Sequence, residues 1–122
     1  RPLNTVQECG DAAFTLVQQG AASTVAVSMG EQGAVLAHRH GVWHAPALEV
    51  PATTGTTGAG DCFLAALVWA LEHGDTPPEA LRWGVAAGAA ALLSPGTALA
   101  QAADIHRLHA QVPVPQAITV AR

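Results

Sequence analysis

Lysine is absent from the 122-residue chain, and only 11% of the residues are charged. The basic residues are five arginines spread along the sequence, and the formal net charge is -4. Proteins that bind nucleic acid normally concentrate basic residues on one surface, where they neutralise phosphates. The composition therefore argues against a nucleic-acid partner.

Long hydrophobic runs and cysteines are also scarce. The longest apolar run, residues 84–93, is about half as long as the roughly 20 residues that a membrane-spanning helix needs. Residues 1–11 do not show the charged start, apolar middle and cleavage site of a signal peptide. Two cysteines, Cys9 and Cys62, are too few for a disulfide framework. We therefore expect a cytoplasmic protein with no membrane partner.

The first part of the chain has the pattern of a helix followed by a strand. Residues 5–19 carry a capping pair, Thr5 and Glu8, and an apolar face, and Gly20 would end the helix. Residues 24–28 form a short β-branched run, typical of a buried parallel strand. A helix, a tight turn and a strand in this order favour an α/β layer.

The middle of the chain predicts a hairpin and a helix. Residues 34–38 and 42–44 flank Gly41 and read as a β-hairpin, and residues 46–60 read as a loop. From Asp61 to residue 71 the sequence is apolar on almost every side, which predicts a buried helix with Trp69 in the core. His73 and Gly74 would close this helix.

The last third predicts two more helices. Thr76, two prolines and Glu79 mark a helix start, and the small-residue helix that follows extends to about residue 93. A final helix is expected over about 102–111. The tail, residues 113–122, is either an edge strand or disordered.

The stretch Thr-Thr-Gly-Ala-Gly-Asp at 56–61 carries the clearest chemical signal. Small residues before a helix let several backbone N–H groups point into one space, and the helix start adds partial positive charge. Together they form a site for an anion. Asp61 could accept a proton from an alcohol that attacks phosphorus. Taken locally, the same residues also fit an ordinary turn in which Asp61 caps the helix.

The order of features along the chain resembles one protein family. A strand is followed by Ser-Met-Gly-Glu-Gln-Gly at 28–33, a hairpin, a loop rich in proline and threonine, Thr-Gly-Ala-Gly-Asp at 57–61 and an apolar helix. The small-residue stretch at 83–91 comes next. Over about residues 5–112 this order resembles the C-terminal region of the ribokinase/PfkB carbohydrate kinases.

The resemblance implies an α/β fold, the C-terminal portion of a three-layer α/β/α ribokinase-like architecture with a Rossmann-like sheet flanked by helices. Residues 1–112 would form the nucleotide- and phosphate-binding part, and residues 113–122 a C-terminal tail. Members of the family are considerably longer and begin with a sugar-binding half. The resemblance therefore predicts that this chain is a part of a kinase and is inactive alone.

The resemblance also assigns roles to individual residues. Asp61 would be the catalytic base, and the amides of Gly58, Ala59 and Gly60 would form the anion hole. ATP would lie against the residues that follow the first strand and against the adenine-facing helix, namely Ser28, Gly30, Gly33 and Ala89. A plain strand-to-hairpin turn explains the two glycines equally well.

Cations are implied too. Magnesium is expected because ATP phosphates need charge neutralisation, although the sequence shows no dedicated carboxylate site for it. Many members of the family bind a monovalent cation, such as potassium, through carbonyl oxygens. Those would come from Gly55, Thr57, Ala91, Ser94, Gly96 and Ala98. Pro95 and Gly96 fit a simple helix stop as well.

Two departures from the family pattern point to one branch. Gly55 stands where many relatives have aspartate, and Ala89 stands where ribokinases have a polar residue. Both differences favour the phosphofructokinase-like branch (1-phosphofructokinase, the minor 6-phosphofructokinase and tagatose-6-phosphate kinase), with a fructose phosphate as the expected substrate. A non-catalytic nucleotide-binding or interaction module on the same scaffold is the alternative, and a homodimer is possible in either case.

Other polar and aromatic residues receive structural interpretations. A metal site at His38, His40 and His44 is less favoured than a polar hairpin, since no cysteine or carboxylate joins them. Cys62 reads as a small buried side chain, and Trp83 either packs or borders the nucleotide. The remaining candidates read as surface, cap or solvated-face residues: Glu72, Asp75, Glu79, Asp104, His106 and His109.

Overall fold

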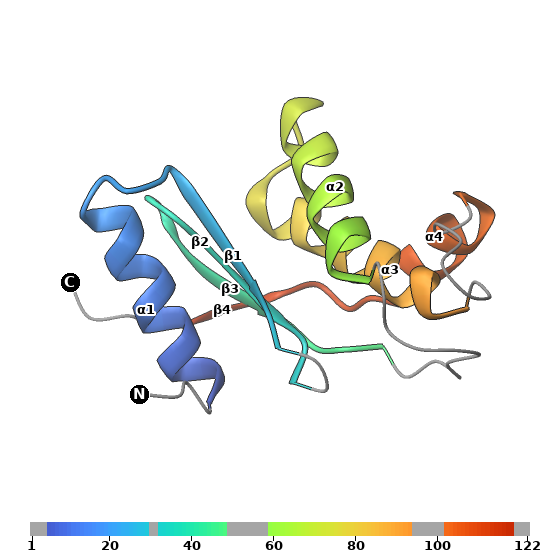
Figure 1. Ribbon diagram of the computed structural model, residues 1–122, viewed down its shortest axis with the longest axis horizontal. Coiled ribbons are helices and arrows are strands. Elements are labelled where there is room, and N and C mark those ends of the chain that lie inside the picture. Colours follow the sequence, from blue (N-terminus) through green and yellow to red (C-terminus); the bar gives the residue numbers. More distant parts are fainter. Residues whose placement is uncertain (1–4, 30–31, 49–58, 94–101, 119–122) are drawn as a thin grey trace.

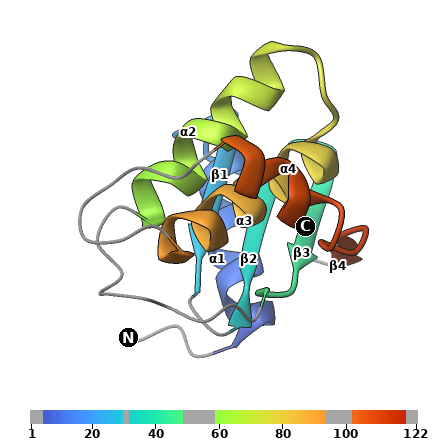
Figure 2. The same cartoon turned by 90° about the vertical axis from the view of Figure 1, so that its right-hand side faces the viewer.

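The computed structural model describes residues 5–29, 32–48, 59–93 and 102–118, which form three layers (Figures 1 and 2). A four-stranded sheet of order β1-β2-β3-β4 lies in the middle, and all its neighbouring strands are antiparallel. Helix α1 covers one face, α2 and α3 cover the other, and α4 packs on α3. The elements are α1 (Val6–Gln18), β1 (Thr24–Ser28), β2 (Ala34–His38), β3 (Gly41–Ala45), α2 (Ala59–Glu72), α3 (Pro77–Leu93), α4 (Ala102–His109) and β4 (Gln116–Ile118).

The α/β class is confirmed, but the parallel strand predicted at 24–28 is wrong. β1 pairs antiparallel with β2, with Thr24 opposite His38 and Ser28 opposite Ala34. β1 is also only half-buried, because it lies at one edge of the described sheet. The most deeply buried strand is β2 of the predicted hairpin, in which every residue except His38 is buried, because it has strands on both sides and helices on both faces.

Strand β2 divides the core between the two faces of the sheet. Ala34 and Leu36 belong to the larger apolar cluster, which the helices α2, α3 and α4 complete. Ala37 belongs to the smaller cluster, with Ala13 and Phe14 of α1. Alternate side chains of a strand point to opposite faces, so one short strand anchors both helical layers.

The tail contributes a strand to this sheet. β4 pairs with β3 at the other edge, with Val42 opposite Ile118 and His44 opposite Gln116. For residues 116–118 the structure therefore shows the strand rather than disorder. Within the part of the chain that is described, no helix combines the length and the apolar composition needed to cross a membrane.

Helix boundaries follow the sequence signals closely. Thr5 caps α1, accepting a hydrogen bond from the Glu8 amide at 3.0 Å, and Gly20 and Gly74 adopt positive φ after α1 and α2. The burial predicted for α2 is wrong on most of its surface. It packs on α3 through one face, whereas Leu64, Val68 and Trp69 are 54%, 43% and 54% exposed.

Trp69 is therefore not a core residue. Its ring stacks on His73 at a centroid distance of 4.1 Å, near the C-terminal end of α2. The sequence could not show this, because an almost uniformly apolar helix does not reveal which of its faces meets a neighbour.

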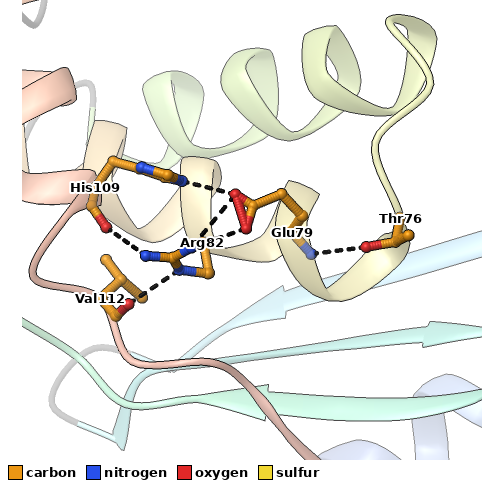
Figure 3. A network of polar contacts seen from close by, with 5 residues as sticks. All are labelled: Thr76, Glu79, Arg82, His109 and Val112. Carbon is orange, nitrogen blue, oxygen red and sulfur yellow. Dashed lines mark hydrogen bonds and ion pairs between the residues drawn. The ribbon is translucent and has the colours of Figure 1, made fainter.

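A polar cluster joins the start of α3 to the end of α4 (Figure 3). Arg82 donates hydrogen bonds to the carbonyl oxygens of Val112 and His109, at 2.9 and 3.0 Å, and forms an ion pair with Glu79 at 2.9 Å. Nε2 of His109 lies 2.8 Å from the second carboxylate oxygen of Glu79. We call Glu79, Arg82 and His109 the α3–α4 clamp.

The clamp overturns two expectations. His109 does not belong to a solvated face, since its side chain is 18% exposed and its ring stacks on Trp83. Glu79 is more than a cap residue. Partial burial raises the pKa of its carboxyl, but the hydrogen bonds and positive charges of His109 and Arg82 outweigh burial and hold the pKa below its ordinary value.

Arg82→Met should lower the free energy of unfolding by about 2 kcal/mol, because it removes the donor to two carbonyl oxygens and one of the two partners of the Glu79 carboxylate. The matched control is Arg107→Met. Arg107 pairs with Asp104 on the surface and is 55% exposed. That change should cost less than about 0.5 kcal/mol. Urea unfolding measures both losses. A loss for Arg82→Met no larger than that for Arg107→Met would show that the clamp adds no more stability than an exposed ion pair.

Gly33→Ala should destabilise the protein far more than Gly20→Ala. Both glycines have positive φ, +91° and +79°. A Cβ at Gly33 would overlap the carbonyl oxygen of Ala45, whereas a Cβ at Gly20 would meet nothing within 4 Å. We expect losses of more than about 3 kcal/mol and about 1 kcal/mol. Thermal unfolding of the two variants provides the comparison, and similar losses would contradict the steric argument.

Candidate functional site

The first turn of α2 holds the residues that the sequence singled out. The helix begins at Ala59, two residues before the predicted start, so Ala59 and Gly60 lie inside its first turn together with Asp61. Backbone N–H groups in a first turn have no partner within the helix. Asp61 and Gly60 are both exposed, and a Cβ at Gly60 would meet nothing within 4 Å.

A large cavity of about 530 Å³ opens on the Asp61 side of this turn. Helix α2 forms one wall, α3 contributes Trp83 and Ala87, and α4 forms the opposite wall through Ala102, Ile105 and His106. The α2 wall consists of Asp61, Cys62, Ala65, Ala66 and Trp69. Cys62 is half-buried rather than buried as predicted, because it faces this space.

A small cavity of about 130 Å³ lies against the other side of the turn. It brings together four residues that the sequence had assigned to the nucleotide or the phosphate: Ser28, Gly33, Ala59 and Gly60. Ser28 ends β1 and Gly33 precedes β2, so both belong to the end of the sheet nearest α2. The first turn of α2 thus lines both cavities.

Helix α3 supplies wall residues that the sequence interpretation missed. Gly84, Val85, Gly88 and Leu92 line the small cavity. A Cβ at Gly84 would lie 3.0 Å from ring atoms of Phe63, and one at Gly88 would lie 3.4 Å from the carbonyl oxygen of Ala59. Two glycines four residues apart were the available signal, because that spacing lets two helices approach closely on one face.

The other predicted residues lie elsewhere or outside the described residues. Ala89 and Ala91 are buried in α3, at 7% and 6% exposure, and neither is among the residues around the two cavities. Several predicted site residues fall outside the described residues. They are Gly58 of the predicted anion hole, Gly30 of the predicted nucleotide site, and five of the predicted cation ligands: Gly55, Thr57, Ser94, Gly96 and Ala98.

Metal-binding side chains do not gather in the described part of the chain, where no group of three or more such residues is placed to hold an ion. In the hairpin, Nε2 of His44 lies 2.7 Å from the carbonyl oxygen of Gln32. Burial, with the neighbouring His40 and Arg39, lowers the pKa of His38. The structure thus shows local contacts for His38 and His44.

The charge around the cavities limits what each can bind. None of the described residues that line them is an arginine. A phosphate here would depend on backbone amides and on the positive end of α2. A carboxylate at this position can accept a proton.

Comparison with known proteins identifies the family of this chain. The sequence model of the pfkB family carbohydrate kinases matches residues 1–104 of this chain. The ATP-dependent 6-phosphofructokinase isozyme 2 of Mycobacterium tuberculosis is 43% identical over 96 residues, which are 79% of this chain and 28% of that protein. The isozyme 2 of Escherichia coli is 34% identical over 114 residues, 90% of this chain and 35% of that protein.

Solved structures give the same result. Escherichia coli phosphofructokinase-2 in complex with potassium superposes with a TM-score of 0.83 at 33% identity, over 91% of this chain and 36% of that one. Ribokinase from Thermotoga maritima gives a TM-score of 0.71 at 30% identity, over 86% and 34%. The chain thus spans about a third of the length of these relatives. Because the match covers most of the chain in sequence and in fold, this chain belongs to the pfkB family of carbohydrate kinases.

Proposed function

We propose that this chain carries the phosphoryl-transfer site of an ATP-dependent sugar-phosphate kinase, in which Asp61 is the general base. The observation that supports this most directly is the position of the carboxylate. It is exposed in the first turn of α2, at the large cavity, while its neighbours Ala59 and Gly60 line the small one. One turn can then face an acceptor on one side and a nucleotide on the other.

The reaction follows from this placement. Asp61 accepts the proton of the acceptor hydroxyl as its oxygen bonds to the γ-phosphorus of ATP, and the bond from that phosphorus to the bridging oxygen breaks and releases ADP. The amides of Gly58, Ala59 and Gly60 hold the negative charge of the transferred group. Because these amides would hold the negative charge, the mechanism does not need an arginine at the described cavity walls.

The nucleotide is assigned to the side of the α2 turn where the small cavity lies, next to Ser28 and Gly33. Magnesium bound with the nucleotide would neutralise phosphate charge. A monovalent cation is also part of the proposal, since one structural relative is a complex with potassium. Its ligands would be carbonyl oxygens of Gly55, Thr57, Ala91, Ser94, Gly96 and Ala98.

We assign a fructose phosphate as the acceptor. The relatives include 6-phosphofructokinases and a 1-phosphofructokinase of Vibrio cholerae that is 31% identical over 116 residues, 93% of this chain and 35% of that protein. The described walls of the large cavity are mostly apolar and do not suit a phosphate. We therefore propose that other residues hold the sugar phosphate and that they lie outside this chain, which spans about a third of the length of its relatives, so that the chain alone is inactive. Assembly into a homodimer stays a prediction.

Asp61→Asn in the complete kinase should lower kcat by about 10²- to 10⁴-fold, because the amide cannot accept the proton, while ATP binding stays nearly unchanged. Glu72→Gln is the matched control, since Glu72 is exposed at the opposite end of the same helix. It should leave kcat unchanged. A coupled assay for ADP with fructose 6-phosphate or fructose 1-phosphate, together with calorimetry for ATP, provides both measurements.

Two outcomes would contradict the proposal. Unchanged turnover in Asp61→Asn would exclude Asp61 as the base. Nucleotide binding without any turnover in the complete unmodified protein would favour the non-catalytic module instead. Efficient phosphorylation by this chain alone would contradict only the statement that the acceptor site needs residues beyond it.

A further inference from the structure

Helix α2 carries an uncovered apolar face. From Asp61 onward its exposed residues recur at intervals of three and four, which places them on one face of the helix. They are Asp61, Leu64, Ala65, Val68, Trp69 and Glu72. We call the apolar middle of this face, Leu64, Ala65, Val68 and Trp69, the α2 stripe. The buried face of the helix is a different one, which packs on α3.

The α2 stripe is unusual for a helix surface in contact with water. Solvent-facing positions of a helix are normally charged or polar. Here the exposed positions between Asp61 and Glu72 carry no polar side chain. Ala65 and Trp69 also line the large cavity, so the apolar surface continues from the stripe into that space. A continuous exposed apolar surface of this kind marks a place where another part of a protein packs.

Strand β1 adds an open sheet edge. In the described sheet it pairs with β2 alone, so alternate residues of β1 direct their backbone N–H and C=O groups away from the sheet. Natural edge strands are commonly protected by charge, proline or short length. At the other edge β4 has only three residues, whereas β1 reads Thr-Val-Ala-Val-Ser and has neither charge nor proline. The sequence of β1 is thus that of a strand with neighbours on both sides.

The stripe and the open edge lie on the same side of the molecule. Helix α3 packs over β2 and β3, while α2 contacts β1. Figure 2 shows α2 on the β1 side of the sheet, away from β4. A strand added beside β1 would continue the middle layer, and a helix connected to that strand would lie in the outer layer next to α2. One segment of protein could therefore cover both features.

The length of the relatives indicates what covers this surface. Escherichia coli phosphofructokinase-2 superposes on 91% of this chain, but the shared part is only 36% of its own length. The larger part of such a kinase must therefore pack against the fold described here. The α2 stripe and the β1 edge offer it apolar area together with unpaired backbone groups.

Two other occupants fit the surface less well. The face that contains the stripe begins with Asp61 and ends with Glu72, so the α2 helices of two copies would bring carboxylates together in either direction. Helices that lie on a lipid surface carry lysine or arginine beside their apolar face. Helix α2 contains neither residue.

We propose that the α2 stripe and the open edge of β1 form one docking surface for the remaining part of the kinase domain. That part supplies a strand beside β1 and apolar side chains over Leu64, Val68 and Trp69. Because Asp61 begins the same face of α2, the docked part also borders the candidate site. The proposal rests on the family and on this surface, and it does not depend on Asp61 being the base.

Cysteine labelling of the complete kinase tests the docking surface without measuring turnover. Val68→Cys probes the stripe, and Leu16→Cys on α1 is the matched control, since the native side chains are 43% and 44% exposed in this chain. Iodoacetamide labels each folded variant, and peptide mass spectrometry separates the new thiol from Cys9 and Cys62. Each rate is divided by the rate in urea. The thiol of Val68→Cys should then be protected at least about tenfold more than that of Leu16→Cys.

Equal protection of the two thiols would overturn the proposal, because the stripe would then be no better covered than the control surface. Protection of Val68→Cys that disappears on dilution would overturn it as well, since the occupant would be a second copy. Hydrogen exchange of the unmodified kinase decides the question if a variant does not fold. All amides of β1 should exchange as slowly as those of β2, whereas fast exchange at alternate residues of β1 would contradict a docked strand.

Discussion

The close contact between α2 and α3 is the constraint on which the candidate site depends. Gly84 and Gly88 present no side chain to α2, so Phe63 and the carbonyl oxygen of Ala59 can lie directly against the α3 backbone. This approach fixes the first turn of α2 above the core. The turn then lines both cavities, with Asp61 at the large one. Larger side chains at the two glycines would push this turn outward and change both spaces together.

The same arrangement supports the proposal that a chain with few charges binds a phosphate. Ordered amides at a helix start offer donors and partial positive charge without a lysine or arginine. Carboxylates are usually poor neighbours for phosphate, but the carboxylate here faces the other cavity. In the proposed mechanism, separating the amides from the base within one turn would avoid a direct conflict of like charges.

Helix α4 is held differently. Its contact with α3 combines one fully buried apolar side chain, Leu108, with the polar clamp formed by Glu79, Arg82 and His109. The layer nearest the sheet is thus held mainly by apolar packing, whereas the α4 wall of the large cavity is held by polar contacts as well.

The sequence alone determined most of the local elements and the family. Caps and glycines predicted the limits of α1 and the end of α2, because these signals depend on neighbours within one turn. The order of motifs along the chain, with Thr-Gly-Ala-Gly-Asp among them, indicated the family. Tertiary structure decided the antiparallel pairing of β1, the exposure of Trp69 and the stacking of His109 on Trp83. Each of these depends on contacts between segments distant in sequence. Neither hydrophobic periodicity nor composition specifies which faces of two distant elements will meet.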